Sequence, residues 1–151
     1  MDKIAIGADH AGFKLKEFVK KLLREKGLEV VDVGTYNEER CHYPEYAKRV
    51  AKMVSQGEVY RGILICGSGI GMSIVANKFK GVRAALCHNI YSAKFSRLHN
   101  DSNILCLGGR VTGEDLTREI VEVWLSTPFE GGRHFQRLQF IEEIERENFR
   151  G

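Results

Sequence analysis

The sequence is short of cysteine pairs, of long apolar runs and of charge of one sign, and each shortage excludes a class of protein. Its four cysteines, Cys41, Cys66, Cys87 and Cys106, form no Cys-x-x-Cys pair, so we expect neither a disulfide framework nor a zinc site. No run approaches the roughly 18 apolar residues of a membrane-spanning helix, and the start lacks a signal-peptide pattern. We therefore expect a cytoplasmic protein that does not bind membranes.

The net charge of +3 is too small to indicate a nucleic-acid-binding protein. With 151 residues, of which 43% are hydrophobic and 28% charged, the chain is expected to form one soluble globular domain spanning residues 1–151. The densest basic stretch, residues 14–26, also carries an apolar stripe at helical spacing. Its lysines are therefore expected to lie on a solvated helix face.

Strand-like and helix-like patterns alternate along the chain. Strands are expected at residues 3–7, 28–33, 62–66, 82–87 and 103–107, and helices at 14–26, 44–56, 70–79, 90–99 and 114–126. Strands separated by helices of this length pair in parallel through right-handed crossovers. The predicted fold is α/β: a three-layer α/β/α sandwich around a five-stranded parallel sheet.

The end of the chain has a different pattern. Pro128 and the pair Gly131-Gly132 interrupt it before a last amphipathic helix, about residues 133–148. The apolar residues of this helix share one face: Phe135, Leu138, Ile141 and Ile144. Such a helix packs either on a neighbouring subunit or on its own domain, and the pattern leaves both open.

The most informative segment is a buried strand that ends in Cys66 and continues as Gly67-Ser68-Gly69-Ile70-Gly71. Ligands bind at the carboxyl edge of a parallel sheet, and the unpaired amides of the following helix attract anions and favour the thiolate form of a nearby thiol. The two other strand cysteines, Cys87 and Cys106, are expected to be buried filler.

Two commoner interpretations of this turn fail. A P-loop needs Lys-Ser or Lys-Thr after its last glycine, and neither pair is present. A dinucleotide fingerprint starting at Gly67 requires glycine or alanine where Met72 stands. We therefore expect no nicotinamide cofactor and no nucleotide.

Further polar residues follow the predicted strands and helices. Asp9 and His10 come after the first strand and Arg110 after the fifth, which predicts that they share an edge with Cys66. His99 and Asn100 end the fourth helix, where His99 could also serve as a cap. Asp9 and His10 likewise suit turns, and exposed arginine pairs such as Arg133 and Arg137 are common. Together, three arginines and a histidine at one edge would hold a dianion.

These motifs, in this order, resemble the type B ribose-5-phosphate isomerases, a family that also includes galactose-6-phosphate and allose-6-phosphate isomerases. The resemblance runs essentially end to end. It includes Gly7-Ala8-Asp9-His10-Ala11-Gly12, the segment 66–73, Ala76-Asn77-Lys78, His99-Asn100, Gly108-Gly109-Arg110, Arg133 and Arg137. Some family members lack the cysteine and place a glutamate after the last glycine. Met72 occupies that position here, so the chain resembles the cysteine type.

The resemblance implies a role for each matching residue. Cys66 would be the catalytic base that moves a proton between carbons 1 and 2 of ribose 5-phosphate, and His99 would help to open the sugar ring. The backbone of Gly67, Ser68, Gly69, Ile70 and Gly71 would stabilise a cis-enediolate, with the Ser68 hydroxyl. Asp9 and Asn100 would contact the sugar. His10, Arg110, Arg133 and Arg137 would bind the phosphate.

The resemblance also implies a Rossmann-like sandwich that acts as a homodimer or homotetramer in the pentose phosphate pathway, with active sites shared between subunits and with no metal or cofactor. The residues alone leave two other functions open. One is isomerisation of a six-carbon sugar phosphate, and the other is a non-catalytic sugar-phosphate-binding module.

Overall fold

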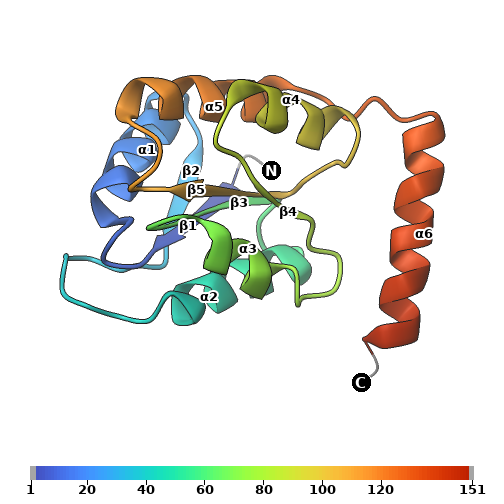
Figure 1. Cartoon of the computed structure of the whole chain (residues 1–151), viewed down its shortest axis with the longest axis horizontal. Helices are drawn as coiled ribbons and strands as arrows, with labels where there is room; N and C mark the ends of the chain where they lie inside the picture. The colour runs from blue at the N-terminus through green and yellow to red at the C-terminus, as the bar shows by residue number, and fades with distance from the viewer. Residues whose placement is uncertain (1–2, 150–151) are drawn as a thin grey trace.

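The computed structural model describes residues 3–149 and shows a five-stranded parallel sheet between helices (Figure 1). The strands are β1 (Lys3–Ala8), β2 (Glu29–Asp32), β3 (Arg61–Cys66), β4 (Ala84–Leu86) and β5 (Ile104–Gly108), in the order β2-β1-β3-β5-β4. The helices are α1 (Phe13–Glu25), α2 (Tyr43–Ser55), α3 (Ile70–Ala76), α4 (Ile90–Leu98), α5 (Glu114–Ser126) and α6 (Arg133–Asn148).

The predicted three-layer sandwich is confirmed. Helices α1, α4 and α5 cover one face of the sheet and α2 and α3 cover the other (Figure 1). Because side chains alternate along a strand, Ile63 and Ile65 of β3 enter one core, whereas Leu64 and Cys66 enter the other. Cys87 and Cys106 are buried, as expected, and burial raises the pKa of both thiols, which keeps them protonated.

Helix α3 ends three residues earlier than predicted, and the side chain of Asn77 gives the reason. Its amide group donates to the carbonyl oxygen of Ser73 at 3.0 Å and to that of Ala84 at 3.0 Å. Its Oδ1 accepts from the amide of Ala84 at 2.9 Å. One side chain thus caps the helix and ties its end to the start of β4, which is also shorter than predicted.

One expectation about the basic stretch in α1 is wrong, because Lys16 does not face solvent. Its side chain is 0% exposed, and Nζ contacts both carboxylate oxygens of Asp32, at 2.8 and 2.6 Å. Asp32 ends β2, beneath α1, and also accepts from Lys20 at 2.8 Å. Burial alone would raise the pKa of Asp32, but the hydrogen bonds from Lys16 and Lys20 outweigh it and lower that pKa.

Replacing Asp32 with asparagine should destabilise the protein by about 3 kcal/mol at pH 7, because the buried Lys16 loses its main counter-ion. Since the pKa of Asp32 is lower in the folded state, its stabilisation is present above the unfolded value of about 3.9 and is lost as the pH falls through the folded value. Urea unfolding of both proteins between pH 7 and pH 3 measures this loss. The difference in the free energy of unfolding between the variant and the unmodified protein should narrow only in acid.

The matched control is Glu29→Gln in the same strand, where the ion pair with Lys3 is exposed. This variant should change the free energy of unfolding by less than about 1 kcal/mol. Equal losses in the free energy of unfolding would show that the buried pair of Lys16 and Asp32 stabilises the protein no more than the exposed pair does.

Helix α6 stands apart from both helical layers, at the right of Figure 1. Its predicted bounds are confirmed. Leu138 of its apolar face is buried, whereas Phe135, Ile141 and Ile144 stay exposed. Glu145 accepts a hydrogen bond from the amide of Gly81 at 2.7 Å, which ties the far end of the helix to its own domain. Within residues 3–149, no helix is long and apolar enough to cross a membrane.

Candidate active site

Cys66 is the last residue of β3 and lies at the carboxyl edge of the sheet, as predicted. Its side chain is 5% exposed, and Sγ accepts a hydrogen bond from the amide of Gly69 at 3.1 Å. The hydroxyl of Ser68 accepts from the amide of Ile70 at 3.1 Å. The sulfur of Cys66 thus already has a backbone donor at the start of the turn.

The tight turn after Cys66 depends on Gly69. This residue has φ +80°, and a methyl group on it would lie 2.6 Å from Cδ1 of Leu86 and 2.9 Å from the backbone of Leu107. Only glycine combines this conformation with such a close backbone approach. The strain-free turn is what allows the Gly69 amide to reach the sulfur of Cys66.

Replacing Gly69 with alanine should therefore lower stability by about 2–3 kcal/mol and reduce activity, because positive φ costs about 1–2 kcal/mol and the methyl group displaces β5. Gly57 is a matched control, since it has φ +76° and no atom near its would-be methyl group. Gly57→Ala should lower stability only by the cost of positive φ, about 1–2 kcal/mol, and should leave kcat unchanged. Thermal unfolding and steady-state kinetics measure both effects, and equal behaviour of the two variants would contradict this account.

Cys66 opens into a cleft of about 600 Å³, which we call the carboxyl-edge cleft. Its lining residues are Asp9, Tyr43, Cys66, Gly67, Ser68, Ile70, Gly71, Ile74, Arg110 and Val111. The structure thus brings Asp9 and Arg110 to Cys66 as predicted. Sequence reasoning did not single out Ile74 and Val111, because nothing in the pattern separates an apolar residue at a cleft from one in the core.

The cleft supplies charge of both signs next to the thiol. Asp9 is buried, and its Oδ1 accepts from the amide of Gly12 at 3.0 Å, which is the turn role that the sequence left open. The side chain of Arg110 covers Gly67, because a methyl group there would lie 3.4 Å from its Nη1. The ring of Tyr43 packs against Gly71, where a methyl group would lie 2.5 Å from the ring.

His10 follows Asp9 and is oriented by the loop before α2. Its Nδ1 accepts a hydrogen bond from the amide of Cys41 at 3.3 Å. Because one ring nitrogen of a neutral histidine accepts and the other donates, this contact puts the hydrogen of the neutral ring on Nε2. His10 can therefore donate to an anion.

The remaining predicted site residues lie at the opposite edge of the sheet. In a parallel α/β fold each helix runs back from the carboxyl edge, so His99 and Asn100, which follow α4, come to the amino edge. Arg133 begins α6, which follows the end of α5 at that edge, and Arg137 lies one turn further. We call these four residues the amino-edge cluster. Within one chain, Arg133 and Arg137 therefore lie at the edge opposite to Arg110.

The ring of His99 contacts several side chains. The His134 ring stacks on it with centroids 4.1 Å apart and planes 11° apart, and Phe95 meets it edge-on at 4.9 Å. Its Nε2 lies 3.9 Å from Oε2 of Glu130. Sequence reasoning missed His134 and Glu130, and no periodic or motif signal marks them.

His99, Glu130 and His134 also form a group of potential metal donors whose ligand atoms lie within 4.8 Å of one another. The sequence analysis expected no such cluster. However, the donor lone pairs of an imidazole lie in the plane of its ring, and the two rings are nearly parallel. An ion bound to both would lie out of the plane of at least one ring, so the arrangement does not fit a metal site.

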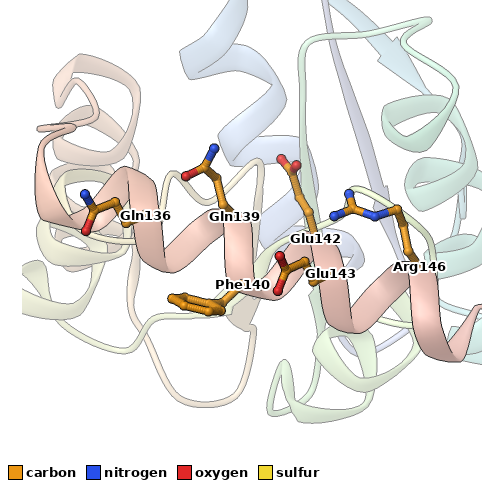
Figure 2. Close-up of a pocket in the computed structure, with 6 residues that line it drawn as sticks. All are labelled: Gln136, Gln139, Phe140, Glu142, Glu143 and Arg146. Carbon is orange, nitrogen blue, oxygen red and sulfur yellow. The ribbon is translucent and has the colours of Figure 1, made fainter.

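A second hollow, of about 500 Å³, lies along the outer side of α6. Figure 2 shows its lining side chains, all of which project from this one helix: Gln136, Gln139, Phe140, Glu142, Glu143 and Arg146. A single helix cannot enclose a small molecule, and this one offers no nucleophile there. The carboxyl-edge cleft is therefore the candidate active site.

Comparisons with known proteins show which family the chain resembles. Residues 4–141 match the family described as Ribose/Galactose Isomerase. The ribose-5-phosphate isomerase B of Escherichia coli is 54% identical over 145 residues, which cover 96% of this chain and 97% of the relative. The D-erythrulose-4-phosphate isomerase of Pectobacterium atrosepticum is 45% identical over 143 residues, covering 93% of both.

Among solved structures, the ribose-5-phosphate isomerase B of Clostridium thermocellum superposes with a TM-score of 0.94 and 51% identity. The superposition covers 96% of this chain and 98% of that chain. The family match, the identities and the matched length all agree with one assignment. The chain belongs to the ribose/galactose isomerase family.

Proposed function

We propose that this protein interconverts ribose 5-phosphate and ribulose 5-phosphate through a cis-enediolate. The proposal depends mainly on the position of Cys66. Its sulfur accepts a hydrogen bond from the amide of Gly69, inside a cleft that Asp9 and Arg110 also line. Aldose–ketose isomerisation needs one group that removes a proton and returns it to the adjacent carbon. A thiol that lines the cleft beside backbone amides meets this need, and two of the relatives are named for this reaction.

In the proposed mechanism, Cys66 takes the proton from carbon 2 of the open-chain aldose and returns it to carbon 1. Negative charge develops on the sugar oxygens meanwhile, and preorganised donors stabilise it. The loop Gly67 to Gly71 supplies these donors together with the hydroxyl of Ser68. The amide of Gly69 already donates to Cys66 and that of Ile70 to Ser68, so the other amides of the loop are the ones assigned to the enediolate.

The remaining assignments follow the charges of the side chains. His10, Arg110, Arg133 and Arg137 bind the phosphate dianion, and binding of this remote group orients the reacting carbons. Asp9 and Asn100 contact the sugar hydroxyls. His99 opens the furanose ring, a step that must precede isomerisation because the cyclic sugar has no free aldehyde. No cofactor is needed for these steps.

The proposed site requires two subunits. The six residues of β3 separate the two edges of the sheet by roughly 17–20 Å, which is too far for His99 and Cys66 of one chain to share one pentose. Exposed apolar side chains border each half: Ile70, Ile74 and Val111 near the cleft, and Phe135, Ile141 and Ile144 on α6. Patches of this kind mark protein contacts. We infer a homodimer, or a tetramer made of two such dimers, in which each cleft faces the partner's amino-edge cluster.

The direct test compares sugar phosphates of different length. We expect the highest kcat/KM for ribose 5-phosphate, with lower values for allose 6-phosphate and galactose 6-phosphate, because the phosphate-binding arginines fix the distance from phosphate to Cys66. Erythrose 4-phosphate belongs in the same series, since a relative at 45% identity is named for a four-carbon substrate. Faster turnover of a six-carbon or four-carbon sugar would reassign the substrate.

Exchange of solvent deuterium separates an enzyme from a non-catalytic binding module. An isomerase incorporates deuterium from the solvent into its substrate, whereas a binding module leaves the carbon-bound hydrogens of the bound sugar unexchanged. The same proposal puts the reaction in the pentose phosphate pathway and in the cytoplasm. The thiols of Cys41, Cys66, Cys87 and Cys106 are all free, as is usual in a reducing compartment.

A further inference from the structure

The exposed ring of His99 rests on a buried one. The side chain of His99 is 37% exposed, whereas His134 beneath it is only 3% exposed. The two rings are stacked nearly parallel, and Phe95 meets the ring of His99 edge-on with an interplanar angle of 63°. The terminal torsion of a free histidine side chain has only a broad preference. These two neighbours therefore restrict a torsion that would otherwise be loose.

The nitrogen atoms of His134 do not explain why a histidine is buried here. Its Nε2 is buried and has no hydrogen-bond partner among residues 3–149. Burial lowers the pKa of His134, His99, Arg133 and Arg137 lower it further, and only Glu130 opposes them. The ring is therefore neutral at pH 7, and its flat face is what it offers to His99.

We propose that His134 is a positioning residue, which holds the imidazole of His99 in the orientation that opens the sugar ring. The inference rests on the proposed function, because it assigns ring opening to His99. During that step His99 takes the proton of the hydroxyl group on carbon 1 while the bond between carbon 1 and the ring oxygen breaks, and it then gives the proton to that oxygen, so it is cationic only for a short time. His134 orients His99 for this step, because its flat face limits how far the ring of His99 can turn.

This proposal predicts that the shape of residue 134 matters and its nitrogen atoms do not. Phenylalanine keeps a flat aromatic face and removes the unpaired Nε2, so His134→Phe should retain activity. Leucine is buried equally well but has no flat face, so His134→Leu should release the ring of His99. Gln136→Leu is the control, since Gln136 is an exposed residue of the same helix.

Two assays separate ring opening from isomerisation. Conversion of ribose 5-phosphate requires an open ring. Incorporation of deuterium at carbon 1 of ribulose 5-phosphate does not, because this ketose has its terminal hydroxyl phosphorylated and forms no furanose. We expect His134→Leu to lower kcat for ribose 5-phosphate at least about tenfold while exchange stays within about twofold of the unmodified protein. His134→Phe and Gln136→Leu should keep both rates.

A double-mutant cycle tests whether His134 acts through His99. His99→Gln should lower turnover of ribose 5-phosphate and spare the exchange, and adding His134→Leu to it should cause no further loss. An additional loss would show that His134 acts by another route, and so would equal losses of turnover and exchange in His134→Leu. Loss of activity in His134→Phe would show that the nitrogen atoms are needed, and it would overturn the stacking role.

Failure of the proposed function gives a different result. If the unmodified protein does not isomerise ribose 5-phosphate, the substrate assignment is wrong. If His99→Gln loses turnover and exchange equally, the ring-opening role of His99 is wrong. If the substrate assignment and the ring-opening role of His99 both hold, a His134→Leu variant that behaves like the unmodified protein would overturn the positioning role alone.

Discussion

Replacing Cys66 with alanine is expected to abolish isomerisation, with a loss in kcat of at least about 10³-fold. The thiol is the only group in the carboxyl-edge cleft assigned to carry the proton, and its removal leaves the phosphate-binding side chains in place. Substrate affinity should therefore change little. Steady-state kinetics give kcat, and calorimetric titration of ribose 5-phosphate gives the affinity. Deuterium exchange into ribulose 5-phosphate should be lost together with turnover.

Cys87→Ala provides the control, because Cys87 is a buried core cysteine that directly follows β4 and lies outside the cleft. It should lose some stability and keep its kcat. Normal turnover in Cys66→Ala would show that Cys66 is not the catalytic base. Loss of affinity in parallel with turnover would instead assign Cys66 to binding.

Mixing two inactive variants should restore activity, which is the second large effect. In a dimer built from one Cys66→Ala chain and one His99→Gln chain, one cleft combines both substitutions and the other combines none. If chains pair at random, half of the dimers are mixed, and we expect roughly a quarter of the activity of the unmodified protein. Coexpression of differently tagged chains, followed by purification on both tags, isolates the mixed dimer for the assay with ribose 5-phosphate.

The decisive control is a chain that carries both substitutions, mixed with the unmodified chain. Here each cleft of the mixed dimer lacks one of the two groups, so purified mixed dimers should be nearly inactive. If every active site were built within one chain, the two results would be reversed. Such a reversal would require His99 and Cys66 to meet inside one subunit, contrary to their opposite edges.

Much of the fold was accessible from the sequence, because it follows from local patterns. The alternation of strands and helices predicted a parallel sheet with helices on both faces, and the structure confirms it. The segment from Ile63 to Gly71 was found in the same way, since a buried strand that runs into glycines is a local signal. The ends of the helices and strands were predicted less accurately. Helix α3 stops at Ala76 because Asn77 bonds to Ala84, a contact between segments that no periodicity reveals.

Contacts between distant segments account for the errors as well. Lys16 was expected in solvent, because a lysine within a basic amphipathic helix is usually exposed. It is buried because Asp32, sixteen residues away, ends a strand directly beneath it. No sequence pattern marks His134, since its proposed role depends on the ring of His99 on which it stacks.

The sequence by itself determined that Cys66 stands before a glycine turn at the carboxyl edge, with Asp9, His10 and Arg110 following neighbouring strands. These placements depend only on the direction of each strand. A parallel sheet also places His99 and Asn100 at the other edge, because a helix returns the chain across the sheet before these residues, which follow α4. The tertiary structure decided that Arg133 and Arg137 lie at that edge as well. Their position depends on the path of the loop after α5, where the amide of Glu130 donates to the carbonyl oxygen of Leu98 at 3.0 Å. No local pattern predicts such a contact between distant segments.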